Sequence, residues 1–255
     1  MAMNSRCSLE GRRVVITGGA QGMGAIHAAE CLRRGARVAV FDIDLNALAN
    51  MSNQLGGQGD ILAMHVDIAD RHSVEVAVQE VAQGLGGIDA LVSNAGTIHT
   101  TQGIADTDDD DWDRTLAVHV GGARNLCRAA LPWLKLAKDG RIVIISSMWA
   151  QRGPGFGYAY CAAKGALLAF TRNLAVELGP TGILVNAVTP GSVATRMAAA
   201  YGPEQIVEDC KSIPMARWGE AREVSGLVCY LISEDVGYLT GQTIAINGGQ
   251  IIAGS

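Results

Sequence analysis

The chain has 255 residues, of which 49% are hydrophobic and 32 are glycine, and its formal net charge is −5. It is long enough to form one large α/β domain with a sizeable core. The sequence contains no basic block of the kind that binds nucleic acid. Its apolar runs are all much shorter than the roughly 20 residues of a membrane span. The first residues, MAMNSRCSLEGRR, lack the apolar region of a secretory signal, so we expect a cytoplasmic protein.

The six cysteines are scattered along the chain and include no C-x-x-C pair. This spacing favours reduced thiols over a disulfide framework or a zinc site. Cys161 stands beside Tyr160, where packing is the expected role and a nucleophilic role stays open.

The N-terminal part has the pattern of a dinucleotide-binding unit. Residues 12–17 (RRVVIT) predict a strand, residues 18–24 (GGAQGMG) a glycine-rich turn, and the following residues a helix that ends at Gly35. A second strand, residues 37–41, ends at Asp42. This βαβ context gives the glycines a function, because they let the backbone approach a pyrophosphate at the start of a helix.

Asp42 indicates which dinucleotide is bound. A carboxylate at this strand end can accept hydrogen bonds from the adenosine ribose hydroxyls and would repel a 2′-phosphate. The turn contains no arginine or lysine, and Gln21 precedes Gly22. We therefore predict NAD rather than NADP. Asp44 could share this role, but its position suits a helix cap better.

Strand and helix patterns continue to alternate through the rest of the chain. Strands are predicted at 61–66, 88–92, 142–145, 182–188 and 243–246, and helices at 72–85, 112–136, 160–178 and 220–233. No repeat or linker divides the chain, so we expect one doubly wound α/β domain over 1–255, a parallel sheet with helices on both faces. Residues 1–8 are expected to be flexible, and the looser pattern at 192–213 suits a flap over a substrate pocket.

Polar and small residues follow two of these strands. Asp67 follows strand 61–66 and could meet the adenine, and the Asn94-Ala95-Gly96 segment could lie flat beside the cofactor. An ordinary strand-to-loop turn explains the second segment equally well. The acidic run at 106–113 (DTDDDDWD) is interpreted as a helix start rather than a metal site, because acids favour helix N-termini.

Tyr160 and Lys164 are four residues apart, which puts both side chains on one face of a helix. A phenol has a pKa of about 10, and a neighbouring ammonium lowers it by favouring the phenolate. A tyrosine tuned in this way can exchange a proton with a substrate oxygen. Ser147, just after strand 142–145, could hold that oxygen. The same spacing is also common on solvated helices, so the pair alone leaves both interpretations open.

Taken together, these residues resemble the short-chain dehydrogenase/reductase family over about Leu9–Gly249. The resemblance implies a Rossmann-type domain and an NAD-dependent oxidoreductase that interconverts a hydrophobic secondary alcohol and its ketone. It implies that Tyr160 is the acid/base, that Ser147 orients the substrate oxygen, and that Lys164 binds the nicotinamide ribose and lowers the tyrosine pKa. The cofactor-binding residues it implies are Thr17, Gly18, Gln21, Gly22, Met23, Gly24, Asp42, Ile43, Asp67, Ile68, Asn94, Ala95, Gly96, Tyr160, Lys164, Pro190, Gly191, Val193 and Thr195. The expected assembly is a homotetramer or homodimer with a small-molecule substrate.

The chain departs from the family at His119. Relatives carry a catalytic asparagine there, whose backbone carbonyl holds a water that connects the lysine to solvent. We expect His119 to keep that water or to shuttle protons itself, although a buried histidine is more often a core residue. His119 also leaves open a non-redox enzyme on the same fold, a dehydratase, isomerase or cyclase that uses bound cofactor. A scaffold that only binds NAD would not need Ser147, Tyr160 and Lys164.

The predicted substrate wall is mostly apolar and aromatic. We expect Ser147, Trp149, Phe156, Met197 and Tyr201 to contact the substrate, with Ile98 and Met148 nearby. No arginine pair is placed to clamp a carboxylate or phosphate, so the substrate is expected to be neutral and hydrophobic. No metal site is predicted.

Overall fold

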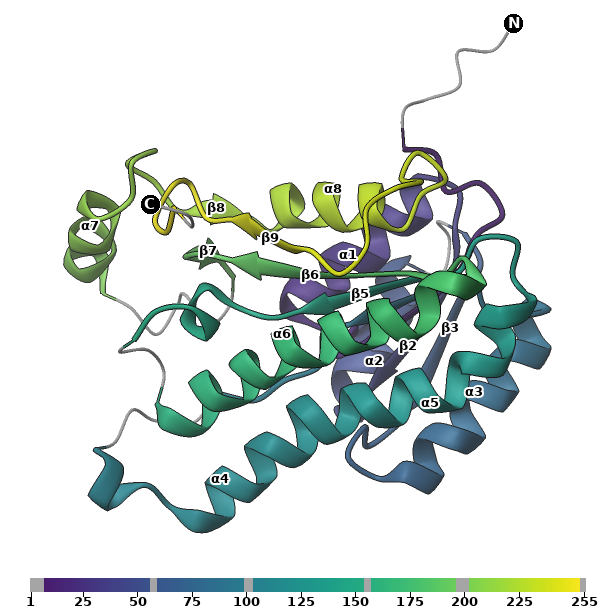
Figure 1. Ribbon diagram of the computed structural model, residues 1–255, viewed down its shortest axis with the longest axis horizontal. Coiled ribbons are helices and arrows are strands. Elements are labelled where there is room, and N and C mark those ends of the chain that lie inside the picture. Colours follow the sequence, from purple (N-terminus) through teal and green to yellow (C-terminus); the bar gives the residue numbers. More distant parts are fainter. Residues whose placement is uncertain (1–6, 56–58, 99–102, 154–156, 196–201, 253–255) are drawn as a thin grey trace, which may run out of the picture.

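Parallel strands and helices alternate along the chain, as the sequence predicts (Figure 1). The computed structural model describes residues 7–55, 59–98, 103–153, 157–195 and 202–252. The strands are β1 (Arg13–Thr17), β2 (Arg37–Asp42), β3 (Ile61–His65), β4 (Ala90–Ser93), β5 (Arg141–Ile145), β6 (Leu184–Pro190), β7 (Val193–Ala194), β8 (Gly219–Glu220) and β9 (Thr243–Ile246). The α-helices are α1 (Gly22–Arg33), α2 (Leu45–Leu55), α3 (Arg71–Leu85), α4 (Asp109–Leu116), α5 (Gly122–Leu136), α6 (Tyr158–Leu178), α7 (Pro203–Lys211) and α8 (Ala221–Leu231).

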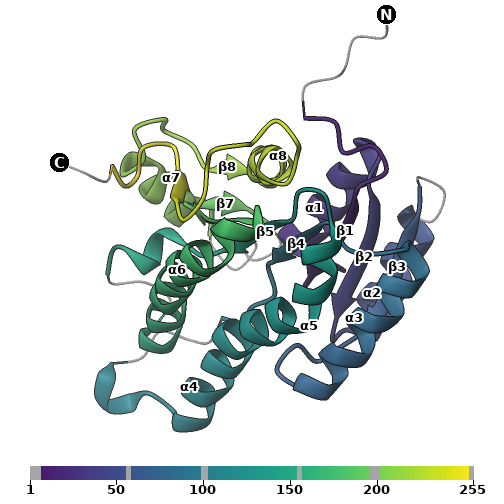
Figure 2. The same ribbon diagram turned by 45° about the vertical axis from the view of Figure 1, so that its right-hand side comes forward.

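Seven strands form one parallel sheet in the order β3-β2-β1-β4-β5-β6-β9. Helices α3, α5 and α6 cover one face, and α1, α2 and α8 cover the other (Figures 1 and 2). The predicted doubly wound fold is therefore confirmed. Strand order reverses between β1 and β4, and in such sheets the crevice at the carboxyl ends beside this point binds ligands.

Burial on both sides explains the composition of the strands. Every residue of β5 is buried, and so are the apolar residues of β1, β2 and β4. A sheet covered on both faces needs nearly continuous apolar strands rather than alternating ones. Two hydrophobic clusters result, one under each layer of helices.

The structure contains elements that the sequence did not predict, including the short strands β7 and β8. Helices α2 and α7 were not predicted, and α7 lies within the predicted flap at 192–213 with no buried residue. The predicted helix at 112–136 is divided by a π-helical turn, Ala117–Gly121, in which the Gly122 N–H donates to the Ala117 carbonyl. The extra residue of such a turn is not visible in hydrophobic periodicity, and π turns are often found at functional sites.

The acidic run starts a helix, as predicted. Asp108 is the N-cap of α4, and its carboxylate accepts from the Asp111 N–H at 2.9 Å. Within the described ranges, no group of three or more His, Cys, Asp or Glu side chains could hold a metal ion. The helices in these ranges are all too short or too polar to cross a membrane.

His27 connects the N-terminal and C-terminal parts of the domain. It is fully buried on α1, and its Nδ1 lies 2.7 Å from Ser225 Oγ on α8. The Ser225 hydroxyl donates to the Ala221 carbonyl at 3.0 Å, so it accepts from the imidazole. Among the described residues, His27 Nε2 has no hydrogen-bond partner. Burial lowers the pKa of His27 to about 4, which keeps the ring neutral in the folded chain.

This histidine makes the fold sensitive to acid. In the unfolded chain its pKa is about 6.5, so between this pH and about 4 the unfolded state binds a proton that the folded state excludes. Stability therefore falls as the pH is lowered through this window, by about 3 kcal/mol for the full shift. In urea unfolding at stepped pH, His27→Gln is expected to remove this part of the slope, while the exposed His72→Gln keeps it. An unchanged slope in His27→Gln would contradict the assignment.

Candidate active site

The glycine-rich turn lies between β1 and α1, where its backbone leaves an open helix start. Gly18 and Gly22 have φ angles of 60° and 57°, in the left-handed region that favours glycine. A Cβ at Gly24 would collide with the Gly18 carbonyl oxygen. The first turn of α1 carries no acidic side chain. The turn therefore suits the pyrophosphate of a dinucleotide, which the helix dipole and free N–H groups stabilise.

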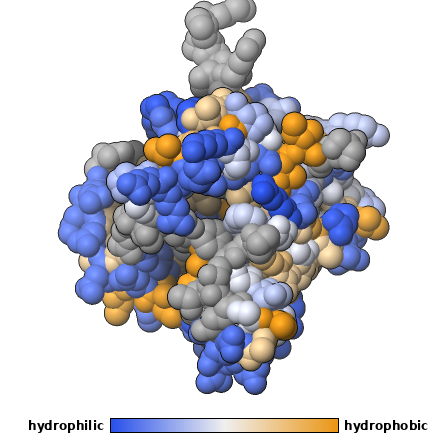
Figure 3. Space-filling view, turned by 90° about the vertical axis from the view of Figure 1, so that its left-hand side faces the viewer, coloured by the Kyte–Doolittle hydropathy of each residue, from blue (hydrophilic) through white to orange (hydrophobic). Residues whose placement is uncertain are grey.

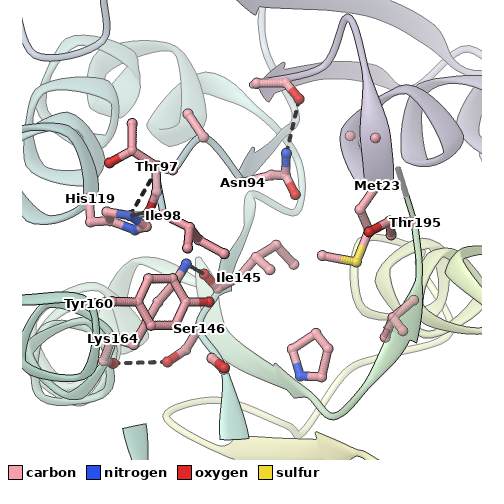
Figure 4. Close-up of a pocket in the computed structure, with 18 of the residues that line it drawn as sticks. Met23, Asn94, Thr97, Ile98, His119, Ile145, Ser146, Tyr160, Lys164 and Thr195 are labelled. Carbon is pink, nitrogen blue, oxygen red and sulfur yellow. Dashed lines mark hydrogen bonds between the residues drawn. The ribbon is translucent and has the colours of Figure 1, made fainter. Parts of the chain in front are cut away.

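Asn94 holds this turn against the end of β4. Its Nδ2 donates to the carbonyls of Thr17 and Gly18 at 3.0 and 3.1 Å (Figure 4). The Thr17 hydroxyl oxygen accepts from the backbone N–H groups of Asn94 and Ala95, each at 3.1 Å. The segment 94–96 therefore braces the predicted cofactor turn, which an ordinary strand-to-loop turn would not do.

Asp42 is fixed by the backbone around it. Its Oδ2 accepts from the Ala20 N–H at 3.0 Å and its Oδ1 from the Asp44 N–H at 3.1 Å. It is buried in the chain and lines the cavity described below. Asp44 instead accepts from the Ala47 N–H at 3.0 Å, so it acts at the start of α2 as a cap. The sequence-based choice between these two acids is supported by this geometry.

Asp67 is paired with a cation that the sequence did not reveal. Its Oδ2 lies 3.2 Å from both terminal guanidinium nitrogens of Arg114, and its Oδ1 accepts from the Ala69 N–H at 2.9 Å. Arg114 comes from α4, 47 residues away along the chain. Arg114 therefore adds a positive group at the predicted adenine end of the cavity.

Tyr160 and Lys164 of α6 lie against the end of β5 (Figure 4), and Ser147, two residues beyond that strand, lines the same cavity. Lys164 Nζ donates to the Ile145 carbonyl at 2.8 Å and lies 5.5 Å from the centre of the Tyr160 ring. The Ser146 hydroxyl donates to the Lys164 carbonyl at 2.8 Å, which fixes α6 to the strand end. A hydrogen bond also joins Ser147 to Tyr160. The predicted three residues thus form one cluster.

Burial sets the protonation of this cluster. Burial raises the pKa of Tyr160 to about 12. The hydrogen bond from Ser147 lowers this pKa, but its effect is smaller than that of burial. Burial lowers the pKa of Lys164 to about 7. Without a bound cofactor, burial outweighs any lowering of the tyrosine pKa by Lys164, whose Nζ donates to the Ile145 carbonyl. At neutral pH Tyr160 is therefore a phenol, the form that donates a proton. Lowering of the tyrosine pKa in the cofactor-bound enzyme stays a prediction.

His119 lies in the π-helical turn and is buried between two parts of the site. Its Nε2 is 3.0 Å from the Thr97 nitrogen and 2.9 Å from the Thr97 oxygen (Figure 4). Its ring meets the Tyr160 ring edge-on, with centroids 5.6 Å apart. A Cβ at Gly96 would lie 3.0 Å from both ring nitrogens and collide with the carbon between them. The imidazole thus fills the space that Gly96 leaves open.

One cavity of about 1080 Å³ joins the glycine turn to the tyrosine cluster. It opens at the carboxyl ends of the strands, the side of the molecule seen in Figure 3, where hydrophilic and hydrophobic side chains are mixed. The predicted residues that line it are Thr17, Gly18, Gln21, Gly22, Met23, Gly24, Asp42, Ile43, Asp67, Ile68, Asn94, Ala95, Gly96, His119, Ser147, Trp149, Tyr160, Lys164, Pro190, Gly191, Val193 and Thr195. This volume is at the upper end for ligand sites and suits a dinucleotide with a small substrate.

The substrate side is more polar than predicted. Ile98, Met148 and Trp149 line it as expected, whereas Phe156, Met197 and Tyr201 lie outside the described residues. Helix α7 and the residue directly after it add polar side chains that were not predicted, namely Gln205, Glu208, Asp209 and Ser212. The other unpredicted lining residues of the whole cavity are Phe41, Val66, Thr97, Arg114, Val118, Ile145, Ser146, Ser192 and Trp218. Pro203 followed by Glu204 is a helix-start signal that could have indicated α7.

Comparison with known proteins shows the family. Residues 18–250 match the family model described as enoyl-(acyl carrier protein) reductase. An uncharacterized short-chain type dehydrogenase/reductase of Sinorhizobium fredii, y4mP, is 35% identical over 251 residues, which cover 96% of this chain and 99% of that protein. The Pseudomonas aeruginosa RhlG/NADP active-site complex is similar with a TM-score of 0.91 and 31% identity, covering 97% and 99% of the two chains. A Brucella melitensis 3-oxoacyl-[acyl-carrier protein] reductase with bound NAD has a TM-score of 0.88 and 34% identity, covering 96% and 92%. The chain belongs to the short-chain dehydrogenase/reductase family.

Proposed function

We propose that this protein is an NAD-dependent oxidoreductase that interconverts a hydrophobic secondary alcohol and its ketone. The meeting of Ser147, Tyr160 and Lys164 in the same cavity as the glycine turn carries this proposal. Membership of an oxidoreductase family supports it. A substrate bound against this cluster would have its reacting oxygen beside a phenol that can give or take a proton.

Bound NAD⁺ supplies the hydride acceptor for oxidation. The chain provides the proton chemistry and the positioning. Tyr160 Oη takes the hydroxyl proton during oxidation and returns it during reduction, and the Ser147 hydroxyl orients the same substrate oxygen by a hydrogen bond. Lys164 Nζ would hold the nicotinamide ribose. Since Tyr160 is protonated at neutral pH in the chain alone, it is ready for ketone reduction without any prior change.

The cofactor-binding residues fall into two groups. The turn at 17–24 and Asp42 would hold the pyrophosphate and the adenosine ribose, and the loop at 190–195 would hold the nicotinamide carboxamide through Val193 and Thr195. The similar structures carry NADP in one case and NAD in the other. The choice for this chain therefore depends on its own residues, and the buried carboxylate of Asp42 favours NAD.

Changing Asp42 tests the cofactor choice without a known substrate. Asp42→Asn removes the negative charge that repels a 2′-phosphate, so the ratio of Kd for NADP⁺ to Kd for NAD⁺ is expected to fall by about 10- to 100-fold. Asp44→Asn is the matched control, because that acid caps α2, and it should leave the ratio nearly unchanged. Both constants can be measured by calorimetry. Wild-type protein that binds NADP⁺ more tightly than NAD⁺ would contradict the proposal.

The charges in the cavity favour a substrate without a carboxylate or phosphate. Of the described cations that line it, Arg114 is paired with Asp67 and Lys164 is bonded to the Ile145 carbonyl. Helix α7 adds the carboxylates of Glu208 and Asp209 to the lining. An anionic substrate would meet these negative groups and find no unpaired described cation, so a neutral molecule fits better.

Absorbance of the reduced nicotinamide tests the reaction directly. Protein offered NAD⁺ and a panel of secondary alcohols should produce reduced cofactor with neutral apolar members and little with their carboxylate analogues. If NAD⁺ binds and no member of a broad panel reacts, the non-redox alternative, a dehydratase, isomerase or cyclase, becomes the better proposal.

We assign His119 a positioning role in this reaction. In both tautomers of the imidazole, Nε2 bonds to the Thr97 backbone. A protonated Nε2 donates to the Thr97 carbonyl, and an unprotonated Nε2 accepts from the Thr97 N–H. A proton shuttle through this nitrogen would break that contact. The ring instead connects the strand end at Gly96 and Thr97 to the edge of Tyr160.

We infer a homotetramer as the assembly. Exposed apolar side chains on α5 and α6 support this inference. Tyr158 and Val176 of α6 and Leu136 at the end of α5 are all exposed in the single chain. Association that covers these side chains would bury apolar surface.

A further inference from the structure

Asp209 joins three segments at the substrate side of the cavity. Its Oδ2 accepts from the Ser192 hydroxyl and from Trp218 Nε1, both at 2.7 Å. Ser192 lies in the loop between β6 and β7, Trp218 directly precedes β8, and Asp209 is in the last turn of α7. All three residues line the cavity. Hydrogen bonds to an ionised carboxylate are short and about twice as strong as neutral ones.

Two of these segments are already tied together by their backbones. The Gly219 N–H donates to the Ser192 carbonyl at 2.9 Å, and Val193 of β7 pairs with Gly219 of β8. The Ser192 N–H also lies 3.2 Å from Gln250 Oε1. These contacts join the loop at Ser192 to β8 and to Gln250, and its neighbours Val193 and Thr195 are the residues proposed above to hold the nicotinamide carboxamide.

Helix α7 has little apolar anchoring of its own. None of its residues is buried, and its exposed Glu208 and Lys211 form an ion pair within the helix. Ile213, just beyond its end, is buried. The carboxylate of Asp209 thus gives α7 a polar attachment to the loop at Ser192, while Gln205 and Glu208 of the same helix line the cavity.

We propose that Asp209 is a positioning residue that couples the order of α7, and so the shape of the substrate wall, to occupation of the nicotinamide loop. The inference rests on the proposed function, because it needs the cofactor to contact the loop at 190–195. A cofactor that fixes this loop also fixes the Ser192 hydroxyl, and Asp209 passes the restraint to α7. Coupling of this kind is reciprocal, so a better ordered α7 also strengthens cofactor binding.

Hydrogen–deuterium exchange with and without NAD⁺ tests this coupling on the whole protein. In wild type, NAD⁺ should slow exchange at the start of α1 and also slow exchange of α7 by about five- to tenfold. Asp209→Asn should keep the effect at α1 and lose most of the effect at α7. Trp218→Phe, which keeps a ring and removes the donor, should reduce the α7 effect in the same direction. Glu204→Gln, in the first turn of the same helix and outside the cavity lining, should behave as wild type.

The outcomes separate this inference from the proposed function. Protection of α1 without protection of α7 in wild type would overturn the role of Asp209 and leave NAD binding intact. Equal protection of α7 in wild type, Asp209→Asn and Trp218→Phe would also overturn it. No protection at either helix would overturn the proposed NAD binding itself.

Discussion

Replacing Tyr160 by phenylalanine is expected to lower the rate of alcohol oxidation by about 10²- to 10⁴-fold, the usual contribution of a positioned acid/base. The change removes one hydroxyl and keeps the ring that packs against His119. Cofactor affinity should change far less than the rate, since the main loss concerns proton transfer. Initial rates at saturating NAD⁺, with an alcohol that the wild type oxidises, measure the effect.

Tyr158→Phe is the matched control, because Tyr158 begins the same helix and is about half exposed at 49%. Its rate should equal that of the wild type.

The pH dependence of the rate gives a second readout. Oxidation needs the phenolate, and burial raises the pKa of Tyr160 to about 12, so wild-type oxidation should rise with pH while ketone reduction, which needs the phenol, stays nearly constant below that pKa. A Tyr160→Phe enzyme that keeps wild-type rates would refute the acid/base assignment.

Adding one methyl group at Gly96 is expected to slow the same reaction by about 10²-fold, because misplacement of about 1 Å can cost that much. The new Cβ would collide with the His119 ring. The ring cannot move aside easily, since Thr97 holds its Nε2 and Tyr160 packs against it. Either the strand end or the tyrosine must shift. Gly165→Ala in α6 is the control, because the nearest atom to its Cβ would lie at 3.9 Å.

A double variant shows whether the collision is the cause. Asparagine at 119 lacks the ring atoms nearest to Gly96, so Gly96→Ala/His119→Asn should recover at least about tenfold over Gly96→Ala alone, a coupling expected of contacting residues. If the rate loss of the double variant equals the sum of the losses of the two single variants in free-energy terms, Gly96 matters for another reason, such as close approach of the cofactor.

Local patterns were enough to predict the framework of the site. Strand, glycine turn, helix, strand and Asp42 follow one another within one βαβ unit, so their spacing along the chain fixes their arrangement in space. The same holds for Tyr160 and Lys164, whose four-residue spacing on one helix brings them together. These features depend on backbone geometry over short distances, so the spacing of residues along the chain is enough to predict them.

Features that depend on distant segments could not be predicted in this way. The pairing of Asp67 with Arg114 joins residues far apart in sequence, and it depends on how α4 lies against the end of β3. The burial that raises the pKa of Tyr160 in the chain without cofactor also could not be predicted, because spacing gives the neighbour but not the burial. The π turn at His119 inserts one residue into a helical pattern without a proline or glycine to mark its start.

The contact between α1 and α8 has a consequence for synthesis of the chain. The inner face of α1, with His27 and Cys31, is covered by Ser225 and Cys229, each 198 residues further along. During translation α1 emerges well before its covering helix, which lies about 200 residues further along the chain. The cofactor turn can thus form locally on the ribosome, but the helix behind it stays unpacked until α8 has left the exit tunnel. Contacts with such large sequence separation slow folding, and the uncovered apolar face is the part of the nascent chain that a chaperone would protect.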